Sequence, residues 1–245
     1  LKTVDQFKVI HDFSFTDAIE ESGILFRNKI VDDVGKYYKP VHYDHGNGLA
    51  IADVDGDGNL DIYFVTQAGS NGLWRNLGNG RFEDITEQAG VAVENKIGVT
   101  ASFADIDNDG DPDLYVCSDF DWADRFWRND GRGNFTLIES IALRRTSQFS
   151  MGLDFTDLNR DGHVDFITAD MLSRSHKRRK TQMGFMSATD ISVGLVSNRP
   201  QIMQNTLQLS RGDGTWTEIA QYAGVKATEW SWGVAFTDID LDGYE

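Results

Sequence analysis

The chain has 245 residues, 40% of them hydrophobic and 11% aromatic, which suits one sizeable all-β domain or two small ones. Its formal net charge of −16 argues against nucleic acid as a general partner, because phosphate backbones attract basic surfaces. No apolar run approaches the length of a membrane span, so none is expected. The single cysteine, Cys117, excludes an internal disulfide and is interpreted as a packing residue.

The first 47 residues are expected to hold a closing strand and the approach to the first repeat. Residues 13–19 match the last strand of a repeat whose other strands are missing upstream. Gly23 is predicted to end a helical turn, because glycine readily adopts the left-handed conformation that closes a helix. Residue 1 is leucine and no signal peptide is visible, which predicts a processed or truncated product.

A nine-residue acidic loop begins at Asp53 and recurs at Asp105 and Asp157, 52 residues apart each time (105 − 53 and 157 − 105). A fourth copy opens at Asp238 and reaches Glu245. Each loop places oxygen-bearing side chains at alternate positions and glycine at the sixth, where the backbone must turn sharply. Short β-branched and aromatic runs flank the first three loops and predict strands on both sides.

This spacing predicts calcium sites, because calcium takes roughly 6–8 oxygen ligands. The EF-hand is excluded, since its twelfth position is a bidentate glutamate and that position here holds Phe64, Val116 and Thr168. The last ligand is therefore expected from position nine, and position seven is expected to offer its backbone carbonyl. His163 is accordingly interpreted as a tolerated side chain, because imidazole is a poor partner for calcium.

The candidate metal-binding positions make about three complete sites and one incomplete site. They are Asp53, Asp55, Asp57, Asn59 and Asp61; Asp105, Asp107, Asp109, Asp111 and Asp113; Asp157, Asn159, Asp161, His163 and Asp165; and Asp238, Asp240, Asp242 and Tyr244.

A second shared element follows each of the first three loops. It contains a Gly-x-Gly core, which predicts a tight hairpin turn, and an aromatic residue shortly after it (Phe82, Phe135 or Trp216). A closing element, residues 82–91, matches residues 216–225 and 15–24. Each unit therefore contains four strands: one into the acidic loop, one out of it, and a hairpin.

Four-stranded units that repeat in this way are typical of propeller blades. The expected fold is all-β: a partial β-propeller with calcium loops, about three complete repeats and part of a fourth. The expected segments are residues 1–47, 48–99, 100–151, 152–232 and 233–245.

The third interval is 81 residues (238 − 157), which places about 29 extra residues around positions 170–200. This insertion contains a basic cluster from Arg174 to Lys180. Three interpretations are open: a solvated loop, a segment folded back on the acidic loops of the same chain, or a binding surface for an anionic polymer such as acidic polysaccharide.

The loops, with their glycine and aromatic framing, resemble the FG-GAP or VCBS repeats of integrin-α-type β-propellers. Residues 82–91 and 73–80 resemble the branch related to cartilage acidic protein and the ASPIC/UnbV proteins. The resemblance covers roughly residues 13–245. It implies an extracellular calcium-binding propeller whose metal is held at the matching loop positions. The family is functionally uneven, and most of its bacterial members have no assigned activity.

The expected function is non-enzymatic binding or adhesion outside the cell, with a protein or glycan partner, because no catalytic motif is present. One alternative is a carbohydrate-active enzyme, such as a polysaccharide lyase, in which Lys39, His42, Tyr43 and His45 supply a base near bound metal. The other is a purely structural segment of a larger surface or filament protein. The missing blades are expected from the rest of the polypeptide or from other chains.

Overall fold

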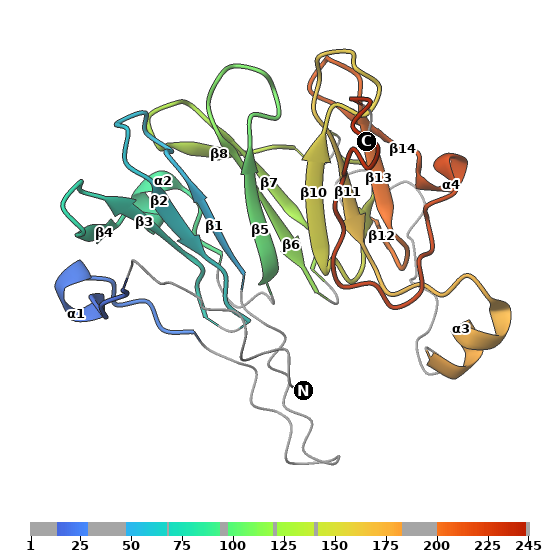
Figure 1. The fold of residues 1–245 in the computed structure, drawn as a ribbon, viewed down its shortest axis with the longest axis horizontal. Coiled ribbons are helices and arrows are strands. Elements are labelled where there is room, and N and C mark those ends of the chain that lie inside the picture. The colour runs from blue at the N-terminus through green and yellow to red at the C-terminus, as the bar shows by residue number, and fades with distance from the viewer. Residues whose placement is uncertain are drawn as a thin grey trace, which may run out of the picture.

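The computed structural model describes residues 14–28, 48–67, 69–93, 98–119, 122–139, 142–182 and 200–243. Across these ranges the chain forms three antiparallel four-stranded sheets, one smaller two-stranded sheet and a few short helices (Figure 1). Within them, none of the helices has the length and apolar character needed to cross a membrane. The predicted all-β fold is confirmed, and the sheets have the arrangement of propeller blades.

Each four-stranded sheet is a meander in which consecutive strands pair. The first blade contains β1 (Leu49–Ala52), β2 (Asp61–Phe64), β3 (Gly72–Asn76) and β4 (Phe82–Asp84). The second contains β5 (Gly98–Ala104), β6 (Asp113–Ser118), β7 (Arg125–Asn129) and β8 (Phe135–Leu137). The third contains β10 (Gly152–Thr156), β11 (Asp165–Ala169), β13 (Thr206–Ser210) and β14 (Trp216–Glu218).

The first strands of the three blades lie next to one another, β1 beside β5 and β5 beside β10. Glycine permits this close approach. A Cβ added to Gly48, beside β1, would lie 2.7 Å from the Cα of Thr100 on β5. One added to Gly152, at the start of β10, would lie 2.9 Å from the Cα of Gly233, in the segment that follows the third blade. The small residues at the start of these strands are therefore required by backbone packing.

The hydrophobic core lies between the blades, because successive side chains of a strand point to opposite faces of its sheet. Strand β6 is buried along its whole length because it has a blade on each face. Leu114 and Val116 pack toward the first blade, while Tyr115 and Cys117 pack toward the third. Burial raises the pKa of the Cys117 thiol well above its ordinary range, which agrees with its interpretation as a packing residue.

An aromatic cluster joins the second and third blades. Trp216 lies edge-on to Phe126 at 5.4 Å between ring centroids, and Phe166 lies 5.0 Å from Tyr115. Such tilted and edge-on pairs are favourable beyond the area that they bury. The aromatic residue after the third Gly-x-Gly turn therefore contributes to packing between blades.

Short helical turns follow the outer strands β4 and β14, namely α2 (Thr86–Ala89) and α4 (Ala220–Ala223), and a similar turn, α1 (Ile19–Ser22), precedes the first blade. Each ends at a left-handed glycine, as predicted: Gly23, Gly90 and Gly224 have φ values of 77°, 78° and 78°. Gly90 packs beside the carbonyl of Phe135, and Gly23 packs beside the carbonyl of Phe82. Each of these two turns therefore contacts the outer strand of the blade that follows it.

Two expected strands are absent from the described ranges. Residues 14–18 form no strand, and the helical turn α1 follows them directly. Residues 233–238 also form no strand, although the Phe236 backbone N–H donates to Asp154 Oδ2 at 2.6 Å, beside β10. Neither segment pairs with a strand of the described ranges, and a sequence pattern that suits a strand cannot replace such a neighbour.

The insertion contains α3 (His176–Gln182). Just after it, β12 (Gln201–Ile202) pairs in parallel with β9 (Thr146–Ser147), which precedes the first strand of the third blade. The acidic loop precedes β11 and α3 follows it, so the basic cluster lies at the other end of the blade from the acidic loops (Figure 1). The interpretation that this cluster folds back on the acidic loops is therefore wrong. Arg178 instead pairs with Glu229 at 3.1 Å.

Candidate metal centre

The acidic loops gather at one end of the blades, and each of the first three lies between the first and second strand of its sheet (Figure 1). In every copy the first aspartate organises the loop by accepting backbone hydrogen bonds from positions five and six. Asp53 accepts from the N–H groups of Asp57 at 3.1 Å and Gly58 at 2.8 Å. Asp105, Asp157 and Asp238 do the same in their loops. The four loops therefore share one backbone conformation.

Two positions in each loop are left-handed. The sixth is always glycine, as the sequence predicted. The fourth is also left-handed, with φ of 73° at Gly56, 61° at Asn108, 58° at Arg160 and 60° at Leu241. Arginine and leucine rarely adopt this conformation, which costs on the order of 1 kcal/mol or more. Strain at these positions is a signal of function that the sequence did not reveal.

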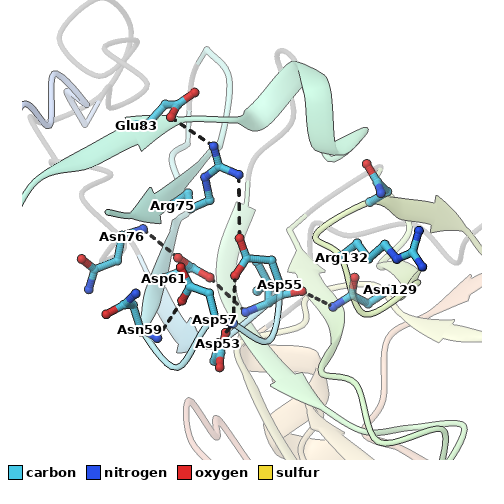
Figure 2. A network of polar contacts seen from close by, with 12 residues as sticks. Asp53, Asp55, Asp57, Asn59, Asp61, Arg75, Asn76, Glu83, Asn129 and Arg132 are labelled. Atoms are coloured by element: carbon cyan, nitrogen blue, oxygen red, sulfur yellow. Dashed lines mark hydrogen bonds and ion pairs between the residues drawn. The ribbon is translucent and has the colours of Figure 1, made fainter. Parts of the chain in front are cut away.

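The ninth aspartate is fully buried in the first three loops (Asp61, Asp113 and Asp165). Asp61 accepts from Val54 N at 2.9 Å and from Asn76 N, on the third strand, at 2.7 Å. Asp113 and Asp165 make the equivalent pair of bonds. This aspartate therefore fastens the loop to the sheet, in addition to its expected role as a ligand (Figure 2).

The structure brings together some of the predicted ligands and not others. Three groups of carboxylate oxygens lie within 4.8 Å of one another: Asp53 with Asp55 and Asp61, Asp105 with Asp107 and Asp109, and Asp238 with Asp240 and Asp242. No such group forms in the third loop, as far as the structure describes it. There Asn159 stands at position three and donates to Asp161 Oδ2 at 2.9 Å.

Position three faces an arginine in the first two blades. Arg128 Nε lies 2.6 Å from Asp107 Oδ2, and Arg75 Nη1 lies 3.8 Å from Asp55 Oδ2. The other oxygen of Asp107, Oδ1, is buried and has no hydrogen-bond partner among the described residues. A buried carboxylate oxygen without a partner is costly, and a bound cation would satisfy it.

Position seven faces the hairpin of its own blade. A Cβ added to Gly78 would lie 3.3 Å from Asn59 Oδ1, and one added to Gly212 would lie 2.5 Å from His163 Nε2. The His163 side chain also lies 3.2 Å from Asn108 Nδ2, in the preceding loop. This side chain is thus engaged in packing, while Tyr244 lies outside the described residues.

Burial and hydrogen bonding shift the pKa values of the loop carboxylates in opposite directions: burial raises them and hydrogen bonding lowers them. Desolvation raises the pKa of Asp61 and Asp165, and raises the pKa of Asp113 to about 7. Hydrogen bonds lower the pKa of Asp57, chiefly from the backbone of Asn59, and of Asp161, chiefly from the side chain of Asn159. The first and third loops therefore each hold an exposed carboxylate with a lowered pKa and a buried one with a raised pKa, whose charge is costly without a cation.

These residues fit a hard divalent cation. The donors are carboxylate, amide and carbonyl oxygens, which calcium and magnesium prefer, and the loop backbone is wrapped with its side-chain oxygens converging. Positions one, three, five and nine, with the carbonyl of position seven, would hold the ion.

Sequence reasoning missed buried carboxylates at the other end of the blades. Asp124 accepts from Ser118 N, Tyr115 Oη and Ser150 Oγ. Asp170 accepts from Gln148 N and Phe149 N, and desolvation raises its pKa. Asp124 occupies the same repeat position as an asparagine in the other two blades, which was the available signal. The cluster Lys39, His42, Tyr43 and His45 lies outside the described residues.

Comparison with known proteins agrees with this architecture. The FG-GAP-like repeat family matches residues 53–116 and 105–168. Each match begins at one acidic loop and ends in the strand that follows the next acidic loop, β6 or β11. The repeat unit of the family therefore spans two adjacent blades. The chain therefore carries FG-GAP-like repeats arranged as β-propeller blades.

No curated protein sequence matches the chain significantly. One solved structure, described as the structural basis of specific recognition of non-reducing terminal N-acetylglucosamine by an Agrocybe aegerita lectin, is similar at 18% identity and a TM-score of 0.36. The similarity covers 70% of this chain and 37% of that one.

Proposed function

We propose that this chain is a calcium-binding β-propeller module, extracellular or on the cell surface, that binds a protein or glycan without catalysing a reaction. The observation that carries the calcium assignment is the repeated loop geometry together with the buried oxygen Asp107 Oδ1, for which the described part of the chain offers no hydrogen-bond partner. Extracellular modules typically bind calcium at roughly 0.1–1 mM, which suits an exposed carboxylate rim.

Calcium should stabilise the fold by mass action. At about 100 times the dissociation constant, one site adds about 2.7 kcal/mol to the free energy of unfolding. We expect the melting temperature to fall when calcium is removed with a chelator and to return when calcium is restored. A melting curve that chelator leaves unmoved would contradict the assignment.

The first aspartates provide a sharper test. Replacing Asp53, Asp105, Asp157 and Asp238 with Asn should abolish calcium binding in titration calorimetry. A matched variant removes the same four charges from outside the loops, by Glu20→Gln, Glu21→Gln, Glu87→Gln and Glu139→Gln. Equal loss of binding in both variants would mean that calcium responds only to net charge.

The binding role is supported by exposed aromatic side chains. Trp230 and Trp232 are 43% and 47% exposed, and such rings can stack on sugars. Screening the calcium-loaded chain on glycan and protein arrays tests this role. Substrate turnover that is lost on changing His42 or His45 would favour a carbohydrate-active enzyme instead, and the absence of any ligand would favour a structural segment.

Two finer proposals concern relatives and neighbouring blades. We assign the chain to the branch of cartilage acidic protein and ASPIC/UnbV proteins on the resemblance of residues 73–91. We also propose that further blades pack against the first blade. There a cavity of about 840 Å³ is lined by Leu25, Phe26 and Trp74, and the buried Trp74 Nε1 has no partner within the described ranges.

A further inference from the structure

The three blades vary two positions together. Position three of the loop and the fourth residue of the third strand are Asp55 with Arg75 in the first blade, and Asp107 with Arg128 in the second. The third blade has Asn159 with Leu209. The guanidinium is present where the carboxylate is present and absent where it is absent. Arginine at this strand position is therefore matched to the charge of the loop.

The two ion pairs differ in their N···O distances, 3.8 Å for Arg75 with Asp55 and 2.6 Å for Arg128 with Asp107, and the neighbouring strand explains the difference. Arg75 is shared, because its Nη2 also lies 3.1 Å from Glu83 Oε2 on the neighbouring strand (Figure 2). Arg128 has Thr136 at the corresponding cross-strand position and lies 2.6 Å from Asp107. The carboxylate of Asp107 is thus neutralised more fully than that of Asp55.

We propose that Arg75 and Arg128 act as place-holding cations, a proposal that rests on calcium binding by the loops. While calcium is absent, each guanidinium offsets the repulsion among carboxylates held within a few ångströms of one another. When calcium is bound, the same guanidinium repels it, because like charges at short range in a partly buried site are weakly screened. Arginine therefore keeps the calcium-free loop folded and lowers its affinity for calcium.

The difference between the Arg128 and Arg75 ion pairs predicts which substitution should change calcium affinity more. Removing Arg128 should raise the calcium affinity of the second loop by about tenfold, which corresponds to the loss of one close repulsive pair. Removing Arg75 should raise the affinity of the first loop by a smaller factor, because Glu83 already draws part of that charge away. Replacing Glu83 with Thr should have the opposite effect, since Arg75 would then be free to approach Asp55.

The test is calcium titration calorimetry on Arg128→Leu, Arg75→Leu and Glu83→Thr, with melting curves in chelator for each protein. Arg128→Leu should bind calcium more tightly and should melt lower than the unaltered chain only when calcium is absent. Arg81→Leu removes the same charge from an exposed hairpin position and should change neither quantity. In an Asp105→Asn background, which disables the second loop, Arg128→Leu should leave the remaining affinities unchanged.

Two results would overturn the proposal. A fall in affinity on Arg128→Leu would make Arg128 a positioning residue that aims Asp107 Oδ1 at the metal. An unchanged affinity would make the ion pair irrelevant to calcium. Both results are distinct from failure of the proposed function, in which the unaltered chain itself shows no calcium binding.

Discussion

Asn129 donates a hydrogen bond from its side-chain Nδ2 to the carbonyl oxygen of Val54, at 2.9 Å, across 75 positions of sequence. Its backbone N–H also donates to Asp113 Oδ1 at 2.8 Å. One residue on β7 therefore contacts the second residue of the first acidic loop and the ninth residue of the second. The first two acidic loops are therefore connected through the hydrogen bonds of Asn129.

This bond predicts a specific loss of stability. Asn129→Ser, which copies Ser210 of the third blade, should lower the free energy of unfolding by about 1–3 kcal/mol, because the buried carbonyl of Val54 loses its partner. Asn76→Ser is the matched control, since the Asn76 side chain bonds to Leu60 within its own blade at an exposed site. Urea unfolding in chelator measures both. Equal losses would contradict a role for the contact between blades.

The ninth aspartate should matter to the fold even without calcium. Asp61→Ala leaves the N–H groups of Val54 and Asn76 without their acceptor, and we expect a loss of about 2–4 kcal/mol in chelator. Asp57→Ala removes an exposed carboxylate of the same loop and should leave the free energy of unfolding nearly unchanged under those conditions. Both variants should weaken calcium binding. A small effect of Asp61→Ala in chelator would mean that its role is ligation alone.

The buried carboxylates predict how calcium-free stability depends on pH. The pKa of Asp113 is about 7 in the folded chain against an ordinary 3.8, so the folded state binds this proton more tightly than the unfolded state. The stability that this proton provides is fully present below about pH 4 and is lost as the pH rises through about 7. Asp61 and Asp165 shift in the same direction.

Urea unfolding of calcium-free protein between about pH 5 and pH 8 should therefore show stability falling as the pH rises. Asp113→Asn cannot titrate and should flatten this dependence in that range. Calcium-loaded protein should be less sensitive, because the cation compensates the buried charge. An identical pH profile for Asp113→Asn and the unaltered chain would assign the dependence to other groups.

Replacing a hairpin glycine with alanine should destabilise the fold more where another group lies close to the added methyl. Gly131 has a φ of 71°, and an added Cβ would collide with the carboxylate of Asp111. Gly80 has a φ of 76° with nothing within 4 Å of the added atom. Gly80→Ala should cost about 1 kcal/mol from backbone strain, and Gly131→Ala should cost more because Asp111 must move. Thermal unfolding of the two variants, side by side, tests the order.

The acidic loops and strands could be predicted because their determinants are local. The alternate aspartates, the glycine at position six and the β-branched flanks lie within a dozen residues, and the structure places strands at both sides of the first three loops. The left-handed glycines after the outer strands follow the same logic. Each feature depends on neighbours in sequence, where periodicity is informative.

Features that depend on distant neighbours could not be read in this way. Residues 14–18 suit a strand, but no described strand pairs with them, so the pattern did not decide the structure. The left-handed Arg160 carries no mark in sequence, because arginine is not a turn residue. The pairing of Arg128 with Asp107 joins positions that only the blade register brings together.

In the second and third blades, one hairpin glycine lies toward the acidic loop of the preceding blade. Gly133, in the second blade, lies against Asp55 of the first loop, and Gly214, in the third blade, lies near the Arg128 guanidinium over the second loop. The candidate metal sites of the first and second loops are therefore each walled by two successive blades. A cut made at the boundary between blades would split a pocket in half, and duplicating a single blade would not copy a working one. The segment that carries a complete site is therefore offset from the blade: it runs from one acidic loop to the hairpin of the next blade.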